Sequence, residues 1–391
     1  MEQKARFLRA HALALNNRTL HAGGALSSAD LLAVLFYHVL RIDPANPRWV
    51  DRDVFINSRG HACEPLYVAM ADRGFFPWAD LADIEDFGCH LHGLSATTTP
   101  GIEVSMGPLG TGIAVATGMA LSLRTQGRPG RVFVLTGDGE LQEGLSWEGA
   151  LAAGKYGVEN LVVIIDRNRY QSNNRGTETV MPLEPLDDKF RAFGFAVDRI
   201  DGHDMDAIVT TLESAPLQPG KPSCIIADTV KGKGVSFLAS EHVHCGRFGR
   251  DLDPTLLEQA LDEVGGDLRI DARTRCDSVS EIPLGSIANV FSEKLHQWAE
   301  KDARVCYVGV DAMDVPFLEK YPDRAFDVGI AEQSELALAA GLSMQGLVPV
   351  IQAWAPFTPL RNFDQLRDLP PLVKPTSNLH SWGFPLTACG A

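Results

Sequence analysis

The sequence predicts an α/β protein that has a doubly wound parallel sheet and a partial second α/β domain. Between residues 131 and 229, short apolar runs of strand length alternate with segments of helix length. This alternation is typical of parallel strands that crossover helices connect and cover on both faces. It stops in a polar stretch at 251–285 and resumes after residue 300. The 391 residues are enough for two or three domains of roughly 150 residues each.

The N-terminal part is expected to begin with helices. Residues 29–39, ADLLAVLFYHV, form an apolar stretch at helical spacing, and Ser28 and Asp30 are expected to cap it. A short strand is expected at 53–56, and a helix is expected to follow it within SRGHACEPLYVAMADRGFF. Residues 88–112 are dense in Gly, Pro, Ser and Thr, so this segment is interpreted as a loop.

Three apolar runs of strand length predict the core of the first sheet: RVFVLT at 131–136, LVVII at 161–165 and CIIADT at 224–229. A helix is expected between the first two of these strands, at about 141–156. In the second part of the chain, strands are expected at 305–310 and 347–352, with a helix between them at about 332–345.

These patterns predict a first domain at 1–260, a linker at 261–284 and a second domain at 285–391. A second domain of roughly 110 residues is short for a complete doubly wound unit. The segment that follows residue 367 shows neither helical nor strand periodicity. The second domain is therefore expected to be truncated after about residue 367.

Composition narrows the classes of partner. There are 35 Lys and Arg residues against 50 Asp and Glu residues, so the formal charge is −15, which argues against nonspecific binding to nucleic acid or to an anionic membrane. The sequence shows no apolar run long enough to span a bilayer and no secretion signal. The seven cysteines are widely spaced and form no CxxC motif, which is typical of reduced thiols. A cytoplasmic location is expected.

The strongest chemical signal is the tripeptide Gly137-Asp138-Gly139, which directly follows a strand, together with Asn168, which follows the next strand. Because ligands bind at the carboxyl ends of strands in an open parallel sheet, Asp138 and Asn168 are expected to lie close together. A carboxylate and an amide oxygen are suitable ligands for Mg²⁺. The N-terminus of the following helix would face the same anion, and Gly139 would allow a phosphate to approach closely. A simple turn is the alternative interpretation of Gly-Asp-Gly taken alone.

The segment GDGELQEGLSWEGALAAGKYGVENLVVIIDRNRYQ at 137–171 resembles the thiamine diphosphate motif, and in particular the transketolase family. The resemblance implies the thiamine diphosphate-binding fold, with thiamine diphosphate and Mg²⁺ as cofactors. It assigns the metal to Asp138, Asn168 and the main-chain carbonyl of Tyr170. It also implies cofactor contacts from Gly137 and Gly139.

Further segments resemble the same family. HAGGALSSADLL, SRGHACEPLY and the HVHCG that follows TVKGKGVSF are similar to segments that carry active-site histidines, which map to His21, His61 and His244. A fourth family histidine maps to His92 or His90, and His92 is preferred because Gly93 follows it. GIEVSMGPLGTG resembles the loop that lies against the thiazolium ring, and it implies cofactor contacts from Gly107, Pro108 and Leu109.

The second domain resembles the pyrimidine-binding domain of the family. DVGIAEQSELALAAGL is similar to the segment with the cofactor glutamate, here Glu332, whose carboxyl group would promote the imino tautomer of the aminopyrimidine ring. Trp354 and Phe357 match the aromatic pair at that ring, although the first is usually Phe. Asp311 matches an acidic residue of the family near the cofactor. Glu143 and Glu148 match acidic positions in the network that links two cofactors, and Glu143 is also expected in the cofactor site.

The resemblance implies transfer of a two-carbon ketol unit between sugar phosphates. In this family the site lies between two subunits, so a homodimer or a complementing subunit is expected. A deoxyxylulose-phosphate-synthase-like ketol or acyl transferase is an alternative, although GDGELQEG and GPLGTG favour transketolase. A second alternative is an inactive, truncated chain that binds only cofactor or a partner subunit.

Overall fold

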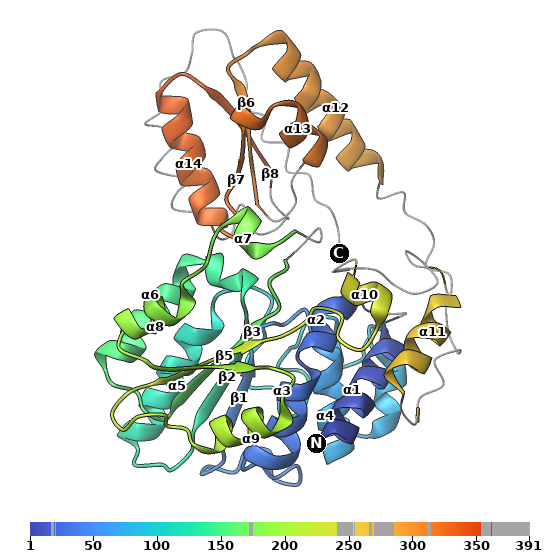
Figure 1. The fold of residues 1–391 in the computed structure, drawn as a ribbon, viewed down its shortest axis with the longest axis vertical. Coiled ribbons are helices and arrows are strands. Elements are labelled where there is room, and N and C mark those ends of the chain that lie inside the picture. Colours follow the sequence, from blue (N-terminus) through green and yellow to red (C-terminus); the bar gives the residue numbers. More distant parts are fainter. Residues whose placement is uncertain are drawn as a thin grey trace. The chain divides into compact units, whose positions relative to one another are not determined.

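The computed structural model describes residues 1–16, 19, 21–171, 175–240, 253, 255–265, 268–269, 285–310, 314–352 and 361. The chain divides into two compact units. The first consists of Met1–Glu178 and Pro182–Cys276, and the second of Thr179–Met181 and Asp277–Ala391. Each unit has its own parallel sheet and its own helices (Figure 1).

The first unit is built on a five-stranded sheet in the order β1-β2-β3-β5-β4, and all neighbouring strands are parallel. The strands are β1 (Val54–Asn57), β2 (Val132–Gly137), β3 (Leu161–Arg167), β4 (Ala196–Asp201) and β5 (Ser223–Asp228). The central strands β2, β3 and β5 are the three apolar runs that the sequence singles out, and they are buried almost throughout. Strand β4 was not predicted, because its sequence, AVDRID, is polar. The strand lies half-buried at the edge of the sheet.

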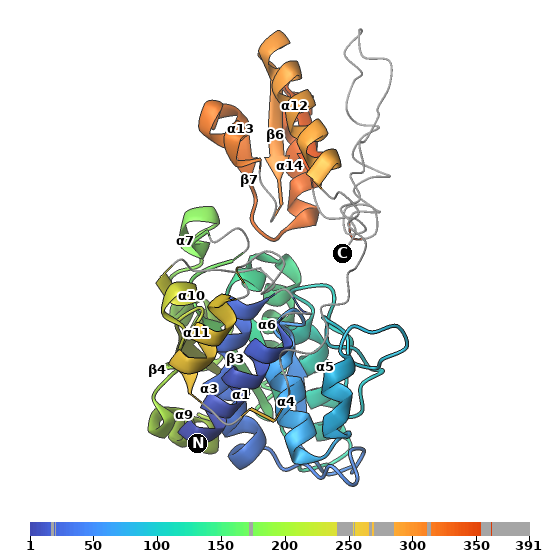
Figure 2. The same cartoon turned by 90° about the vertical axis from the view of Figure 1, so that its right-hand side faces the viewer.

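Helices cover both faces of this sheet, so the fold is doubly wound. Side chains alternate along each strand: Phe133 and Leu135 of β2 pack into one core, and Val132 and Val134 pack into the other. The helices that pack into the first core are α1 (Glu2–Leu15), α3 (Ala29–Val34), α4 (Glu64–Arg73) and α9 (Met205–Glu213). The helices that pack into the second core are α5 (Gly112–Thr125), α6 (Gly144–Lys155) and α8 (Leu186–Ala192). Figure 2 shows α3, α1 and α4 side by side on their face.

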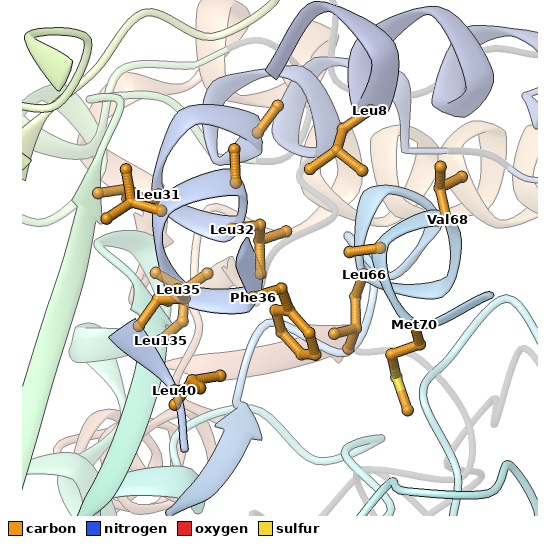
Figure 3. Packing of buried hydrophobic residues seen from close by; sticks show 14 of the residues in the cluster. Leu8, Leu31, Leu32, Leu35, Phe36, Leu40, Leu66, Val68, Met70 and Leu135 are labelled. Carbon is orange, nitrogen blue, oxygen red and sulfur yellow. The ribbon is translucent and has the colours of Figure 1, made fainter. Parts of the chain in front are cut away.

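The first core is densely packed where the N-terminal helices meet the sheet. Leu8 of α1, Leu32 of α3 and Leu66 of α4 converge on Phe36, and Leu135 of β2 lies in the same cluster (Figure 3). All five side chains are almost completely buried. The apolar stretch that begins at residue 29 therefore forms core, as its helical spacing indicates.

The expected cap of that helix was wrong. The preceding short helix α2 (Ala22–Ser27) runs almost directly into α3, and Ser28 makes no side-chain hydrogen bond that caps α3. Asp30 is used elsewhere: its carboxylate accepts hydrogen bonds from the guanidinium of Arg9 and from Nδ1 of His203. A buried carboxylate with these partners fixes tertiary packing rather than a helix end.

The remaining short elements of the first unit complete its surface. They are α7 (Thr177–Val180), which begins in this unit, α10 (Ser236–Ser240) and α11 (Thr255–Val264). Helix α11 lies in the polar stretch that follows residue 251, and its Ala260 and Val264 pack with Ala10 and Leu13 of α1. No helix among the described residues is both long and apolar enough to cross a membrane.

The second unit has a three-stranded parallel sheet in the order β7-β6-β8. Its strands are β6 (Val305–Gly309), β7 (Ala325–Asp327) and β8 (Val348–Gln352), and its helices are α12 (Gly285–Lys301), α13 (Val315–Lys320) and α14 (Glu332–Met344). Strands β6 and β8 and helix α14 were expected. Strand β7 has only three residues and gives no periodic signal. Helix α12 was not predicted, although its buried residues Phe291, Leu295 and Ala299 recur at helical spacing.

A close approach inside the first unit gives a stability prediction. A methyl group on Gly154 of α6 would stand 1.6 Å from the main-chain oxygen of Phe193. We expect Gly154→Ala to lower the free energy of unfolding by about 2–3 kcal/mol, because main-chain atoms must move apart. A methyl group on Gly118 of α5 would meet only open space, so Gly118→Ala should raise the free energy of unfolding by about 0.5–1 kcal/mol. Urea unfolding measures both, and equal effects would contradict the close approach.

Candidate functional site

Asp138 and Asn168 lie at the carboxyl ends of the adjacent strands β2 and β3, as expected. Both are buried, at 2% and 7% exposure. The Oδ1 atom of Asp138 accepts a hydrogen bond from the Gly139 amide at 2.9 Å, and its Oδ2 accepts one from the Arg169 amide at 2.7 Å. The Asn168 carbonyl oxygen accepts from the Tyr170 amide at 3.1 Å. The strand ends therefore bring the two predicted oxygen ligands to one place.

This donor set fits a magnesium ion. A carboxylate oxygen and an amide oxygen each accept about two hydrogen bonds or metal bonds, and Asp138 Oδ1 and Asn168 Oδ1 each receive one from the protein. Among the described residues, no group of three or more His, Cys, Asp or Glu side chains could hold a metal ion. An ion here would therefore take its other ligands from main-chain oxygen, water or a bound phosphate, which is typical of Mg²⁺.

Arg167, which was not predicted as a site residue, lies between these two ligands in the sequence and is completely buried. Its Nη1 donates to Oδ2 of Asp138 at 2.7 Å and to Thr177 at 2.7 Å. The same guanidinium also donates to Glu178 and Glu184, at 2.6 and 3.3 Å. Burial raises the pKa of Asp138, and the Arg167 charge opposes that shift. Arg167 thus links the metal-ligand candidate to the segment at 177–184.

Asp166, the preceding residue, connects three more segments to the end of β3. Its carboxylate is completely buried and accepts a hydrogen bond from the Ser27 hydroxyl at 2.6 Å. It also accepts one from the Thr229 hydroxyl and forms an ion pair with Arg59. These partners come from α2, from the loop after β1 and from the loop after β5. One buried carboxylate therefore holds a helix and two loops around the strand end.

Glu140 holds separate segments together beside the Gly-Asp-Gly turn, as Asp166 does at the end of β3. Its carboxylate accepts hydrogen bonds from the Ser58 hydroxyl at 2.7 Å, the Gly110 amide at 2.9 Å and the Gly137 amide at 2.8 Å. It was not predicted, since a glutamate after a turn looks like a surface residue. The loop with Gly107, Pro108 and Leu109 leads into Gly110, so Glu140 attaches that predicted cofactor loop to the turn.

His21 and His61 are brought together. His21 stands at the start of α2, His61 lies in the loop after β1, and their ring centroids are 4.9 Å apart in an edge-to-face arrangement. Burial, with a contribution from the nearby Arg59, lowers the pKa of His61 to about 4. The His61 ring is therefore neutral near pH 7, with one nitrogen able to donate and one able to accept a hydrogen bond.

Two more cations lie among these loops, although the chain as a whole is acidic. Arg59 is 8% exposed, and its guanidinium donates to the main-chain oxygen of Gly24 at 2.8 Å. Lys231 is 2% exposed, and its Nζ donates to the main-chain oxygen of Gln171 at 3.1 Å. The loop that contains Lys231 is tied to α2, because the Gly232 amide donates to the Gly23 oxygen at 2.9 Å. Buried cations beside a strand end suit a phosphate-bearing ligand.

The other predicted residues of the first unit differ in their surroundings. His90 pairs with Asp80 at 3.0 Å, whereas the main-chain oxygen of His92 accepts a hydrogen bond from Tyr67 at 2.9 Å. His90 therefore has a structural partner, and His92 stays the predicted site histidine.

Glu143 is the buried N-cap residue of α6, and Glu148 is exposed on the same helix. Predicted residue His244 lies outside the described residues.

In the second unit, Glu332 is the first residue of α14 and is 4% exposed. Its carboxylate forms an ion pair with Arg361. The predicted residues Asp311, Trp354 and Phe357 lie outside the described residues. Glu332 is therefore the one predicted residue of this unit whose surroundings the structure describes.

The buried ion pair of Asp166 gives a prediction for the first unit. Asp166→Asn removes the charge that faces Arg59 and leaves a buried cation without its counter-ion. We expect the free energy of unfolding to fall by about 3–5 kcal/mol. Asp188, 72% exposed in its side chain and paired with Arg191, is the matched control, and Asp188→Asn should change it by less than about 1 kcal/mol. Chemical denaturation compares the two, and a similar small loss in both would show that Asp166 does not hold the loops.

Comparison with known proteins identifies the family of this chain. Residues 1–260 match the family model for the transketolase thiamine diphosphate binding domain. The chain is 42% identical over 218 residues to the 6-deoxy-6-sulfo-D-fructose transketolase subunit SqwG of Clostridium sp. (strain MSTE9), a match that covers 56% of this chain and 79% of that protein. It is 38% identical over 243 residues to an apulose-4-phosphate transketolase subunit of Actinobacillus succinogenes, covering 61% and 87%.

Longer relatives match more of this chain but are themselves matched only in part. The transketolase of Pongo abelii is 29% identical over 377 residues, which is 89% of this chain and 59% of that protein. The crystal structure of transketolase from Campylobacter jejuni superposes with a TM-score of 0.63 at 25% identity, covering 94% of this chain and 66% of the other. The expected α/β class with parallel sheets is confirmed. The chain belongs to the transketolase family, and residues 1–260 are its thiamine diphosphate-binding domain.

Proposed function

We propose that this chain carries out, or contributes the cofactor site for, transfer of a two-carbon ketol unit between sugar phosphates, with thiamine diphosphate and Mg²⁺. The observation that supports this most directly is the arrangement at the ends of β2 and β3. There Asp138 and Asn168 offer oxygen ligands in a domain of the thiamine diphosphate-binding type. The relatives are named for two different anionic sugars, 6-deoxy-6-sulfo-D-fructose and apulose 4-phosphate, so the proposal names no individual donor or acceptor.

The residues of the first unit would bind the diphosphate end of the cofactor. Asp138, Asn168 and the main-chain oxygen of Tyr170 would hold Mg²⁺, which neutralises phosphate charge. Gly139, the first residue of a short helical turn after β2, offers an approach with little steric hindrance. Lys231 adds buried positive charge, Arg59 is paired with Asp166, and Arg167 keeps the Asp138 carboxylate oriented.

Other residues would manage protons and the substrate. The bound cofactor supplies a carbanion equivalent and an electron sink for cleavage of a carbon–carbon bond. Glu332 would donate a hydrogen bond to the aminopyrimidine ring and so favour the tautomer that accepts a proton. The neutral His61 beside His21 can exchange a proton with a hydroxyl group without carrying charge at neutral pH. His92, His244, Trp354 and Phe357 stay proposed members of the site.

We further propose that a second polypeptide, either another copy or a complementing subunit, completes the working enzyme. Several relatives are named as transketolase subunits. Helix α6 also exposes large apolar side chains, Leu145 at 40% and Leu151 at 57%. Exposed apolar groups of this size on one helix are consistent with a surface that another chain covers.

The metal assignment predicts the behaviour of one variant. Asp138→Ala removes a proposed ligand of Mg²⁺, so we expect affinity for thiamine diphosphate in the presence of Mg²⁺ to fall by about 100-fold or more. Isothermal titration calorimetry measures the affinity, and circular dichroism checks that the variant folds. Asp206→Ala, at an exposed position on α9, is the control and should bind like the parent. Unchanged affinity in the Asp138 variant would remove Asp138 from the site.

The proposed need for a partner predicts low activity of the isolated chain. With xylulose 5-phosphate, ribose 5-phosphate and saturating cofactors, we expect fewer than about 1 turnover per second. Addition of a complementing transketolase subunit should raise the rate, because groups at the reacting carbon would then be held in place. A homodimer of this chain with a rate on the order of 1–1000 per second would instead show that no second kind of subunit is required.

A further inference from the structure

A second buried carboxyl group lies one helical turn after Glu332. Glu335 is completely buried, and it lies on the same side of α14 as Glu332, because residues three apart are neighbours on a helix. Helix α14 packs against strands β6 and β8. Two acidic side chains thus share one buried helix face, where a protein core ordinarily places apolar groups.

The two carboxyl groups have different partners. Glu332 forms an ion pair with Arg361, whereas among the described residues no donor meets hydrogen-bond geometry with either side-chain oxygen of Glu335. A buried carboxylate without a donor or a counter-ion is so unfavourable that the group retains a proton instead. The difference in partners therefore places the negative charge on Glu332 and the proton on Glu335.

The groups that face Glu335 from the neighbouring strands do not supply a positive charge. Tyr307 of β6 donates its hydroxyl hydrogen to Gln352 of β8 at 2.7 Å. Burial is the main cause that raises the pKa of Tyr307, and nearby acidic residues that include Asp314 and Asp327 raise it further, although the main-chain amide of Asp314 opposes the shift. Within the described part of this unit, the charge that acts on Glu335 is that of Glu332, and the main-chain amide of Gln352 opposes it only in part. Burial first, and then Glu332, raise the pKa of Glu335 to about 8.

We propose that Glu335 is a positioning residue that keeps its proton at neutral pH, because it is buried on the same face of α14 as Glu332, one helical turn away. Ionisation of either group makes ionisation of the other less favourable, and this coupling is reciprocal. The functional part rests on the proposed role of Glu332 at the aminopyrimidine ring. A neutral Glu335 adds no second charge to the face on which Glu332 pairs with Arg361. An ionised Glu335 would place a second negative charge there and repel the Glu332 carboxylate.

The direct test is a titration of the full 391-residue chain without cofactor, with glutamate ¹³C-labelled at the side-chain carboxyl carbon. Loss of one resonance in Glu335→Gln identifies Glu335. We expect this group to titrate near pH 8 in the parent, and in Glu332→Gln to titrate at least about one pH unit lower, which is a tenfold change in proton affinity. Glu319→Gln, on the exposed side of α13, should leave the midpoint unchanged. An unchanged midpoint in Glu332→Gln would overturn the proposal.

A second measurement uses stability. The folded chain retains a proton on Glu335 that the unfolded chain releases near pH 4.5, so stability should fall as pH rises from about 4.5 to about 8. Glu335→Gln imitates the protonated acid and should lack this part of the decline, whereas Glu319→Gln should retain it. The same decline in Glu335→Gln and in the parent would contradict a buried proton. Neither measurement contains thiamine diphosphate, so failure of the proposed function and failure of this coupling are distinguishable.

Discussion

The end of strand β3 depends on one buried carboxylate, that of Asp166. A charge in that position is tolerable only because Ser27, Thr229 and Arg59 supply two hydroxyl donors and a counter-ion. Those three residues belong to helix α2 and to the loops after β1 and β5, which surround the predicted cofactor site. The same contacts that satisfy the charge therefore fix the loops, and the geometry of the site follows from a requirement of electrostatics.

Arg167 extends this principle to the other side of the strand. Its guanidinium faces Asp138, Glu178 and Glu184, so one cation is shared among three carboxylates. The three carboxylates hold the buried Arg167 side chain in place. Only Oδ2 of Asp138 bonds to Arg167, so Oδ1 is left to other partners. The arrangement separates two tasks: Arg167 orients the carboxylate, and a metal ion would use the remaining lone pair.

The sequence predicted the parts of the molecule that depend on local pattern. Strands β2, β3 and β5 are apolar runs because helices cover both faces of the sheet, whereas β4 and β7 lie at sheet edges and have weak patterns. Asp138 and Asn168 were found because their spacing follows from two strands that end side by side. Asp166, Arg167 and Glu140 were missed because the partners that bury them are distant in the sequence, although two adjacent charges after an apolar strand were a signal. The compartment, the substrate and the roles of all the predicted site residues stay predictions.

The distances along the chain between the partners of Asp166 affect how the site can form. Ser27 is 139 residues away and Thr229 is 63 residues away, so neither contact belongs to a local hairpin or helix. Contacts of this kind form only after large loops close, at a substantial cost in chain entropy. A partly folded chain would therefore lack the site altogether, and a ligand that binds the completed site would shift the folding equilibrium toward the native state. Ligand at a hundred times its dissociation constant adds about 2.7 kcal/mol to stability, so cofactor supply during synthesis would influence how much of the newly made chain survives.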